Sequence, residues 1–188
     1  MSAGPEAEGA RRTAQAWVML FADDPEAVSA LAVVRRALEA GRALAGLRRL
    51  RLFELRGELP PRGRLEELLH RSTQFYNPHK ERCLVRVDRA EPAPFASGEQ
   101  ALLVFERGEA RRPAAERWWL HETGERIEVR EGVAWGLRFT EGAEAARATA
   151  ELAVLTSLAG GLFCNPNAQE HRQGGAQVPL PWLLSRAG

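Results

Sequence analysis

Hydrophobic side chains recur along this chain with two spacings, one typical of strands and one typical of helices. Residues 16–21 form a short apolar run that ends before Asp24 and Pro25, which predicts a buried strand. Pro25 suits the first position of a helix and Asp24 suits its N-cap. Apolar residues then return at helical spacing from 28 to 38, and Gly41 is the expected end of this helix.

The rest of the first half continues the alternation. Leucines alternate with Arg and Glu over 50–59, which predicts a strand with one face in water. A helix is expected over 64–74. Asn77 and Pro78 are interpreted as the turn that ends this helix, because a residue before proline is disfavoured in the helical conformation. An alternating segment over 83–87 predicts a closing strand.

The same order of elements recurs in the second half. Residues 101–105 predict a buried strand, and 112–122 predict a helix that ends at Gly124. A half-exposed strand or hairpin is expected over 126–140 and a long helix over 143–158. Three landmarks align the halves at spacings of 83 to 88 residues: Phe21 with Phe105, Gly41 with Gly124, and Asn77-Pro78 with Asn165-Pro166.

This period is too long for a solenoid repeat and suits a small β-α-β-α-β unit. We therefore expect an α+β fold of two ferredoxin-like halves, with helices packed on one face of antiparallel sheets, joined as a pseudo-twofold dimer within one chain. The competing interpretation is a single two-layer α+β domain in which the Asn-Pro pairs match by chance. The predicted organisation is a disordered tail (1–12), a first half (13–90), a linker (91–99), a second half (100–173) and a C-terminal tail (174–188).

Composition narrows the class of protein. Of the 188 residues, 45% are hydrophobic and 27% are charged, which is enough to bury a core. The net charge of +1 gives no electrostatic reason to bind nucleic acid or an anionic membrane. The most apolar stretch, 152–164, is shorter than the ~20 residues that span a bilayer, and no secretory signal is visible. We therefore expect a cytoplasmic protein with no nucleic-acid or membrane partner.

The sequence contains no motif of a catalytic or cofactor site. A phosphate-binding G-x-x-x-x-G-K-[ST] loop, a G-x-G-x-x-G turn and a G-x-S-x-G elbow are all missing. Cys83 could act as a nucleophile with His79 or His121 as its base, but such a cysteine is usually a small buried hydrophobe. The set His70, His79, Cys83, Cys164 and His171 lacks the paired spacing of a metal site. Two cysteines also exclude a disulfide scaffold, and we expect no catalytic residue, cofactor or metal.

Prolines and tryptophans supply the candidate partner contacts. Of the adjacent Trp118 and Trp119, one is expected in the core, and the other is half-buried or an interface anchor. The proline-flanked tail around Trp182 either wraps its own domain or docks on a partner. Each Asn-Pro pair is either a structural turn or a direct partner contact. The candidate partner interface comprises Asn77, Pro78, Trp118, Trp119, Asn165, Pro166, Leu180 and Trp182.

The order of elements, together with Asp24-Pro25-Glu26, the strand at 50–55 and Asn77-Pro78 followed by Glu81, resembles PurS, the small subunit of phosphoribosylformylglycinamidine synthase. The resemblance covers residues 16–88 well. It covers 100–172 more loosely through Asn165-Pro166, with Glu170 one position late. Unlike the simple small subunit, this chain is expected to carry the unit twice, as a fused pair would.

The resemblance implies a non-catalytic assembly subunit of an ATP-dependent glutamine amidotransferase in purine biosynthesis. Its partners would be the large synthetase subunit and the glutaminase subunit, which it would bridge for ammonia transfer, and it is a possible homo-oligomer. One alternative is a regulatory metabolite- or nucleotide-binding ferredoxin-like module that uses arginines at the cleft between the halves. Another is a small enzyme on a dimeric α+β barrel. Arg48, Arg49 and Arg51 could contact phosphate, but nearby acids favour a solvated sheet face.

Overall fold

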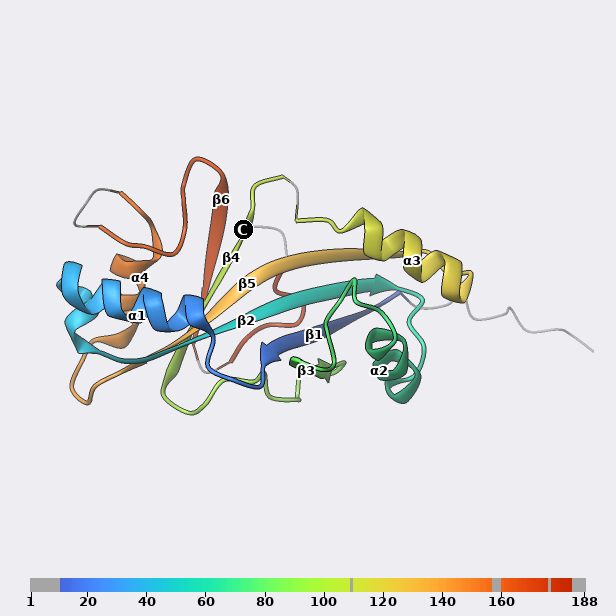
Figure 1. Ribbon diagram of the computed structural model, residues 1–188, viewed down its shortest axis with the longest axis horizontal. Coiled ribbons are helices and arrows are strands. Elements are labelled where there is room, and N and C mark those ends of the chain that lie inside the picture. The colour runs from blue at the N-terminus through green and yellow to red at the C-terminus, as the bar shows by residue number, and fades with distance from the viewer. Residues whose placement is uncertain (1–10, 109, 157–159, 176, 184–188) are drawn as a thin grey trace, which may run out of the picture.

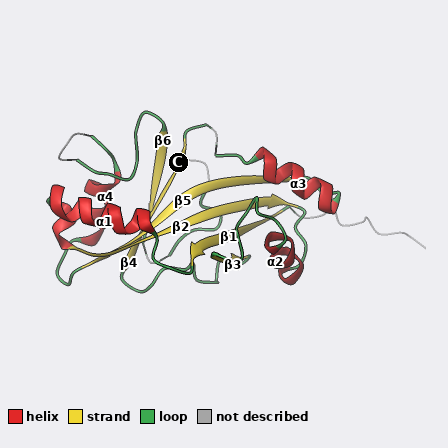
Figure 2. Cartoon of the chain, in the orientation of Figure 1, coloured by secondary structure: helices red, strands yellow, loops and turns green. Residues whose placement is uncertain are grey.

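Within the described residues, six strands form one antiparallel sheet that carries four α-helices, which confirms the α+β class (Figure 1, Figure 2). The computed structural model describes residues 11–108, 110–156, 160–175 and 177–183. The elements are β1 (Arg12–Leu20), α1 (Pro25–Ala37), a 3-10 helix η1 (Ala40–Ala43), β2 (Leu44–Gly57), α2 (Arg62–His70), β3 (Glu81–Arg86), β4 (Glu99–Glu106), α3 (Pro113–Thr123), β5 (Ile127–Phe139), α4 (Ala145–Ala153) and β6 (Gln169–Gly174). Across the sheet the strand order is β3-β1-β2-β5-β4-β6.

Helix α1 begins where the sequence predicts and ends earlier. The carboxylate of Asp24 accepts a hydrogen bond from the backbone N–H of Glu26 at 2.8 Å, which caps the helix. The helix ends at Ala37, so the prediction that Gly41 ends it is wrong. Gly41 lies in η1 against α1, where a Cβ would approach the carbonyl oxygen of Val34 to 2.3 Å. Close packing is therefore the reason for this glycine.

The second helix of each half is shorter than predicted. Helix α2 ends at His70 and α4 at Ala153, so neither Pro78 nor Pro166 is the residue that stops its helix. Helix α4 ends because the chain turns into a parallel bridge between Val154 and Cys164. Residues 157–159 at the end of the predicted long helix lie outside the described residues, as do 1–10 of the expected N-terminal tail. The predicted helix end at Gly124 is confirmed, with φ +78°.

Two hydrophobic cores lie beneath the helices on one face of the sheet. Helices α2 and α3 cover one end, where Leu68 and Trp119 pack on Phe53 and its neighbours. Helices α1 and α4 cover the other end, where Val34 and Leu152 pack in the cluster that contains Trp135 (Figure 1). Each core therefore joins one helix from before residues 91–99 with one helix from after them.

The opposite face of the sheet is covered by irregular chain. Trp17, Leu50 and Leu103 project there, and Trp182 and Leu183 of the C-terminal segment pack on them. The Trp17 ring lies 5.4 Å from that of Phe95 in the linker and 6.2 Å from that of Trp182. No helix in the described part of the chain is long and apolar enough to cross a membrane.

From the centre of the sheet outward, the strands follow one another in the same order on both sides. Strands β2, β1 and β3 form a first arm, and strands β5, β4 and β6 form a second arm in the same order. The two arms meet where β2 pairs with β5. There Arg51 lies opposite Val133, with Leu50 opposite Ala134 and Leu52 opposite Gly132 on either side. We call residues at the same place in the two arms counterparts. The two Asn-Pro segments set this alignment, because Glu81 and Gln169 each lie four residues after the asparagine and begin the outer strand of their arm.

Other counterparts follow from the pairing within each arm. Ala16 and Leu102 hold the same place on β1 and β4, because each lies four residues before the strand partner of Glu81 or Gln169. Ala16 pairs with Phe53 and Leu102 with Trp135, so Phe53 and Trp135 are counterparts, as are Arg51 and Val133 two residues before them. At the outer strands Leu20 pairs with Glu81, and Glu106 pairs with Gln169. On this alignment Met19 holds the place of Phe105, two residues before the predicted match Phe21, and Gln169 holds the place of Glu81, one residue before Glu170.

Candidate functional site

Each arm contains one Asn-Pro turn, and the two turns have the same hydrogen bonds. In the first turn (77–81), the side chain of Asn77 accepts from the N–H of His79 at 3.0 Å, and its own N–H donates to Glu81 at 2.7 Å. In the second turn (165–169), Asn165 accepts from Asn167 at 3.0 Å and donates to Gln169 at 3.0 Å. Both turns lead directly into the outer strand of their arm. The asparagines therefore have a structural role in both places.

A groove with a volume of about 530 Å³ lies on the helical face of the sheet between the start of α1 and the start of α3. We call it the central groove. Its apolar lining includes Val133, Trp135 and Phe163, and the last two rings lie 4.9 Å apart. Its charged lining comprises Glu26, Arg49, Glu106, Arg111, Arg112 and Glu131. A concave site with an aromatic wall and a few charged groups is typical of small-molecule binding.

The guanidinium groups of the central groove are all ion-paired. Arg49 lies 2.9 Å from Glu26, and Arg112 lies 3.0 Å from Glu131. Arg111 pairs at 2.7 Å with Glu116, a residue of α3. These pairs hold the rim of the groove together and leave little free positive charge for an anionic ligand.

The corresponding place in the first arm is filled. Arg51 extends over the ring of Phe53, with its Cζ 5.4 Å from the ring centre. Its Nη2 donates to the backbone carbonyl of Phe75 at 3.0 Å and to Glu81 at 2.8 Å, and its Nη1 lies 3.5 Å from Glu131. The arginines on β2 are expected from the sequence to lie on a solvated sheet face rather than to bind phosphate. In the structure they form ion pairs with carboxylates, and a further pair joins Arg48 to Glu99 at 2.9 Å.

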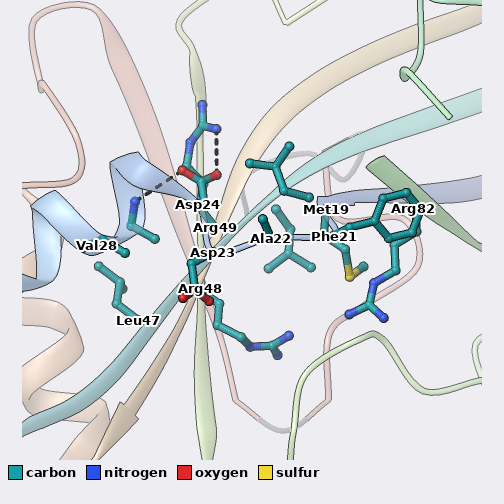
Figure 3. A pocket seen from close by; sticks show the side chains of 13 residues that line it. Met19, Phe21, Ala22, Asp23, Asp24, Val28, Leu47, Arg48, Arg49 and Arg82 are labelled. Carbon is teal, nitrogen blue, oxygen red and sulfur yellow. Dashed lines mark hydrogen bonds and ion pairs between the residues drawn. The ribbon is translucent and has the colours of Figure 1, made fainter. Parts of the chain in front are cut away.

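A second hollow of about 220 Å³ lies where β1 leads into α1 (Figure 3). The Asp24 carboxylate lines this hollow and accepts a hydrogen bond from Arg49, which a dashed line marks in Figure 3. Met19, Phe21 and Val28 form its apolar side, and the Phe21 side chain is 65% exposed. The carboxylate that caps α1 therefore also orients an arginine of the central groove.

Cys83, the candidate nucleophile, has a thiol pKa that is shifted in the wrong direction for that role. Burial, and after it the negative charge of Glu66, raises the pKa of the Cys83 thiol to about 12. Reactive cysteines need the opposite shift, because the thiolate is the nucleophile. Among the described residues, no group of three His, Cys, Asp or Glu side chains is placed to hold a metal ion.

The structure distributes the predicted interface residues between core and surface. Trp119 is buried and Trp118 is half-buried, with its ring 6.0 Å from that of Phe75. Leu180 and Trp182 are buried, and Trp182 packs against the sheet, so the described part of the tail wraps its own fold. Asn165 and Pro166 are exposed, and Asn77 and Pro78 are half-buried. Residues 176 and 184–188 of the predicted tail lie outside the described residues. The accessible candidates are the two Asn-Pro turns and Trp118.

Sequence reasoning did not find the central groove. Trp135, Phe163 and Glu106 are far apart in sequence, and each is typical of an ordinary strand or turn on its own. One signal was present in the shared F-x-N-P pattern, which places Phe163 where Phe75 stands. Comparisons with protein-family models, with curated proteins and with solved structures give no match to this chain.

Proposed function

We propose that this chain is a tandem form of the PurS-like small subunit, and that it serves as a non-catalytic assembly subunit of phosphoribosylformylglycinamidine synthase. In this role it bridges the glutaminase subunit and the large synthetase subunit, so that ammonia passes between their active sites. The observation that carries the proposal is the identical hydrogen-bonding of the two Asn-Pro turns at counterpart places in the sheet. Such agreement supports a duplicated β-α-β-α-β unit with the motif order of that subunit.

The way the helices are shared supports a fused pair of such units. Helix α1 packs with α4, and α2 packs with α3, so each core needs elements from both halves. A small unit of this kind buries too little apolar surface alone, and pairing completes its core. Fusion fixes the pairing in one chain and gives a body with two similar ends, which suits a part that contacts two larger subunits.

Exposed turns would make the contacts. Asn165 and Pro166 are exposed, and Asn77 and Pro78 at the counterpart place are half-buried. Side chains in these turns form hydrogen bonds with the backbone of the same turn, so the turns are preorganised. Binding of a partner would therefore cost little conformational entropy.

The test is a reconstituted synthase assay with two nitrogen donors, with and without this chain. We expect removal of the chain to abolish most glutamine-dependent synthesis and to leave ammonia-dependent synthesis nearly unchanged, because added ammonia needs only the large subunit. Equal glutamine-dependent rates without the chain, or turnover by the chain alone, would contradict the proposal.

A further inference from the structure

The central groove corresponds to the place that the first arm fills with its own arginine. There the Arg51 guanidinium lies over an aromatic ring and donates to a backbone carbonyl and to a carboxylate. The shared Asn-Pro segments align Phe75 with Phe163 and Glu81 with Gln169, and the strand pairing carries this alignment to the other two pairs. The first-arm residues Arg51, Phe53, Phe75 and Glu81 thus correspond to Val133, Trp135, Phe163 and Gln169, and all four of the latter line the central groove.

We infer that the central groove binds a small molecule that carries a planar guanidinium or amidinium group. Val133 is much shorter than Arg51, so the second arm keeps the aromatic wall of the site and leaves out the cation that covers it. A guanidinium group on the Trp135 ring makes the cation–π contact that Arg51 makes with Phe53. The planar fork of such a group also matches carbonyl and carboxylate acceptors.

The charge of the groove favours a cation. Each of its arginines is held by a carboxylate, namely Arg49 by Glu26, Arg111 by Glu116 and Arg112 by Glu131. Glu106 is different, because no cation of the described residues lies within ion-pair distance of it. The hydrogen bond that it accepts, at 2.9 Å, comes from a neutral group, Nε2 of Gln169. The uncompensated charge on the lining is therefore negative, and it lies beside the position of the missing guanidinium.

The volume of the groove indicates that the ligand is larger than a guanidinium group alone. About 530 Å³ is several times the space that one guanidinium group needs, so the ligand carries a further chain or ring. This part would lie toward the start of α3, where Ala110 and Arg111 form the wall.

The test is a titration of the full chain, labelled with ¹⁵N, with N-butylguanidinium, followed by the indole N–H resonances of its five tryptophans. We expect the Trp135 resonance, identified from its loss in Trp135→Phe, to shift saturably. N-butylurea has the same shape without the charge, and we expect it to bind at least tenfold more weakly. No saturable shift, or equal binding of the urea, would overturn the inference.

Two variants locate the site. Val133→Arg supplies the missing guanidinium from the chain itself, and we expect it to weaken N-butylguanidinium binding at least tenfold, whereas Val133→Thr keeps the binding. Glu106 is exposed, so Glu106→Gln tests the charge without disturbing the fold, and we expect about tenfold weaker binding. Unchanged affinity in both Val133→Arg and Glu106→Gln would contradict the assignment. These measurements use the chain alone, so their outcome is independent of the assembly role.

Discussion

Gln15 on β1 and Glu54 on β2 form a fully buried pair beneath the C-terminal segment. Nε2 of Gln15 donates to Oε1 of Glu54 at 2.7 Å and to the carbonyl of Pro179 at 2.9 Å. Glu54 also accepts a hydrogen bond from the backbone N–H of Trp182. Arg86 donates to the carbonyl of Val178 at 2.8 Å. These polar groups fix the backbone of the segment while Trp182 fills the apolar surface of the sheet.

We predict that Glu54→Ala lowers the free energy of unfolding by about 2–5 kcal/mol. The substitution takes this acceptor from the Gln15 amide and from the Trp182 N–H, and each buried hydrogen bond that is lost in this way costs roughly 1–3 kcal/mol. Urea denaturation measures the change. Glu58→Ala, at an exposed position of the same region, is the control and should change stability by less than about 0.5 kcal/mol. Equal losses in both variants would contradict the account of this cluster.

Two leucines near the ends of counterpart helices should respond very differently to truncation. Leu68 on α2 is 1% exposed, so Leu68→Ala should destabilise the fold by about 2–5 kcal/mol. Helical spacing in the sequence places Leu155 in the core as well. The structure corrects this, because α4 ends at Ala153 and Leu155 is 47% exposed. Leu155→Ala should therefore shift the denaturation midpoint little, and a loss similar to that of Leu68→Ala would show that it is buried.

The strands and helices with a strong apolar period were predictable, and those defined by tertiary pairing were not. Residues 16–21 and 101–105 are apolar runs, and β1 and β4 contain most or all of them. Strand β6 has the sequence QEHRQG, without one apolar side chain, and it exists because it pairs with β4 as an edge strand. Strand β2 begins six residues earlier than predicted, because the residues from Leu44 onward pair with β5. Hydrogen-bonded pairing with a neighbouring strand thus decides whether these segments form strands, even where the local hydrophobic pattern does not predict one.

We predict that the Cys83 thiol makes stability fall in alkaline solution. Its pKa is about 12 in the folded chain, against an ordinary value near 9.0, chiefly because of burial. The unfolded chain therefore loses this proton first, and the free energy of unfolding decreases as pH rises from about 9 to about 12. Chemical denaturation of the parent chain and of Cys83→Ala across this range isolates the effect. We expect the difference in slope to be up to about 1 kcal/mol per pH unit, and parallel curves would contradict it.

Gly124 and Gly63 provide a matched pair for backbone conformation. Gly124 ends α3 with φ +78°, and a Cβ there meets no atom within 4 Å, so Gly124→Ala costs only conformational strain, about 1 kcal/mol. Gly63 lies inside α2 with similar free space and no positive φ, so Gly63→Ala should stabilise the chain by up to about 1 kcal/mol. Thermal denaturation should move the two midpoints in opposite directions. A shift of both in the same direction would contradict this assignment.

The candidate site was less predictable than the fold, for a physical reason. Turn chemistry is local, so the Asn-Pro pairs could be recognised in the sequence, and both form turns. Burial of Trp119 rather than Trp118 depends on which face of α3 meets the sheet, which the sequence of that helix leaves open. The central groove depends on a difference between Arg51 and Val133, and that difference has meaning only once the Asn-Pro turns and the strand pairing make them counterparts.

The assembly role is tested most directly by recovering the tagged full chain from its own cells after mild cross-linking, with mass spectrometry of what is attached. The account predicts recovery of the glutaminase and synthetase subunits of phosphoribosylformylglycinamidine synthase, with cross-links near the Asn-Pro turns at 77–81 and 165–169. With an amine-specific reagent, the cross-links at the first turn should be lost when Lys80, the only lysine of the chain and a residue of that turn, is replaced by Arg. Recovery of the chain without either subunit would contradict the proposed function.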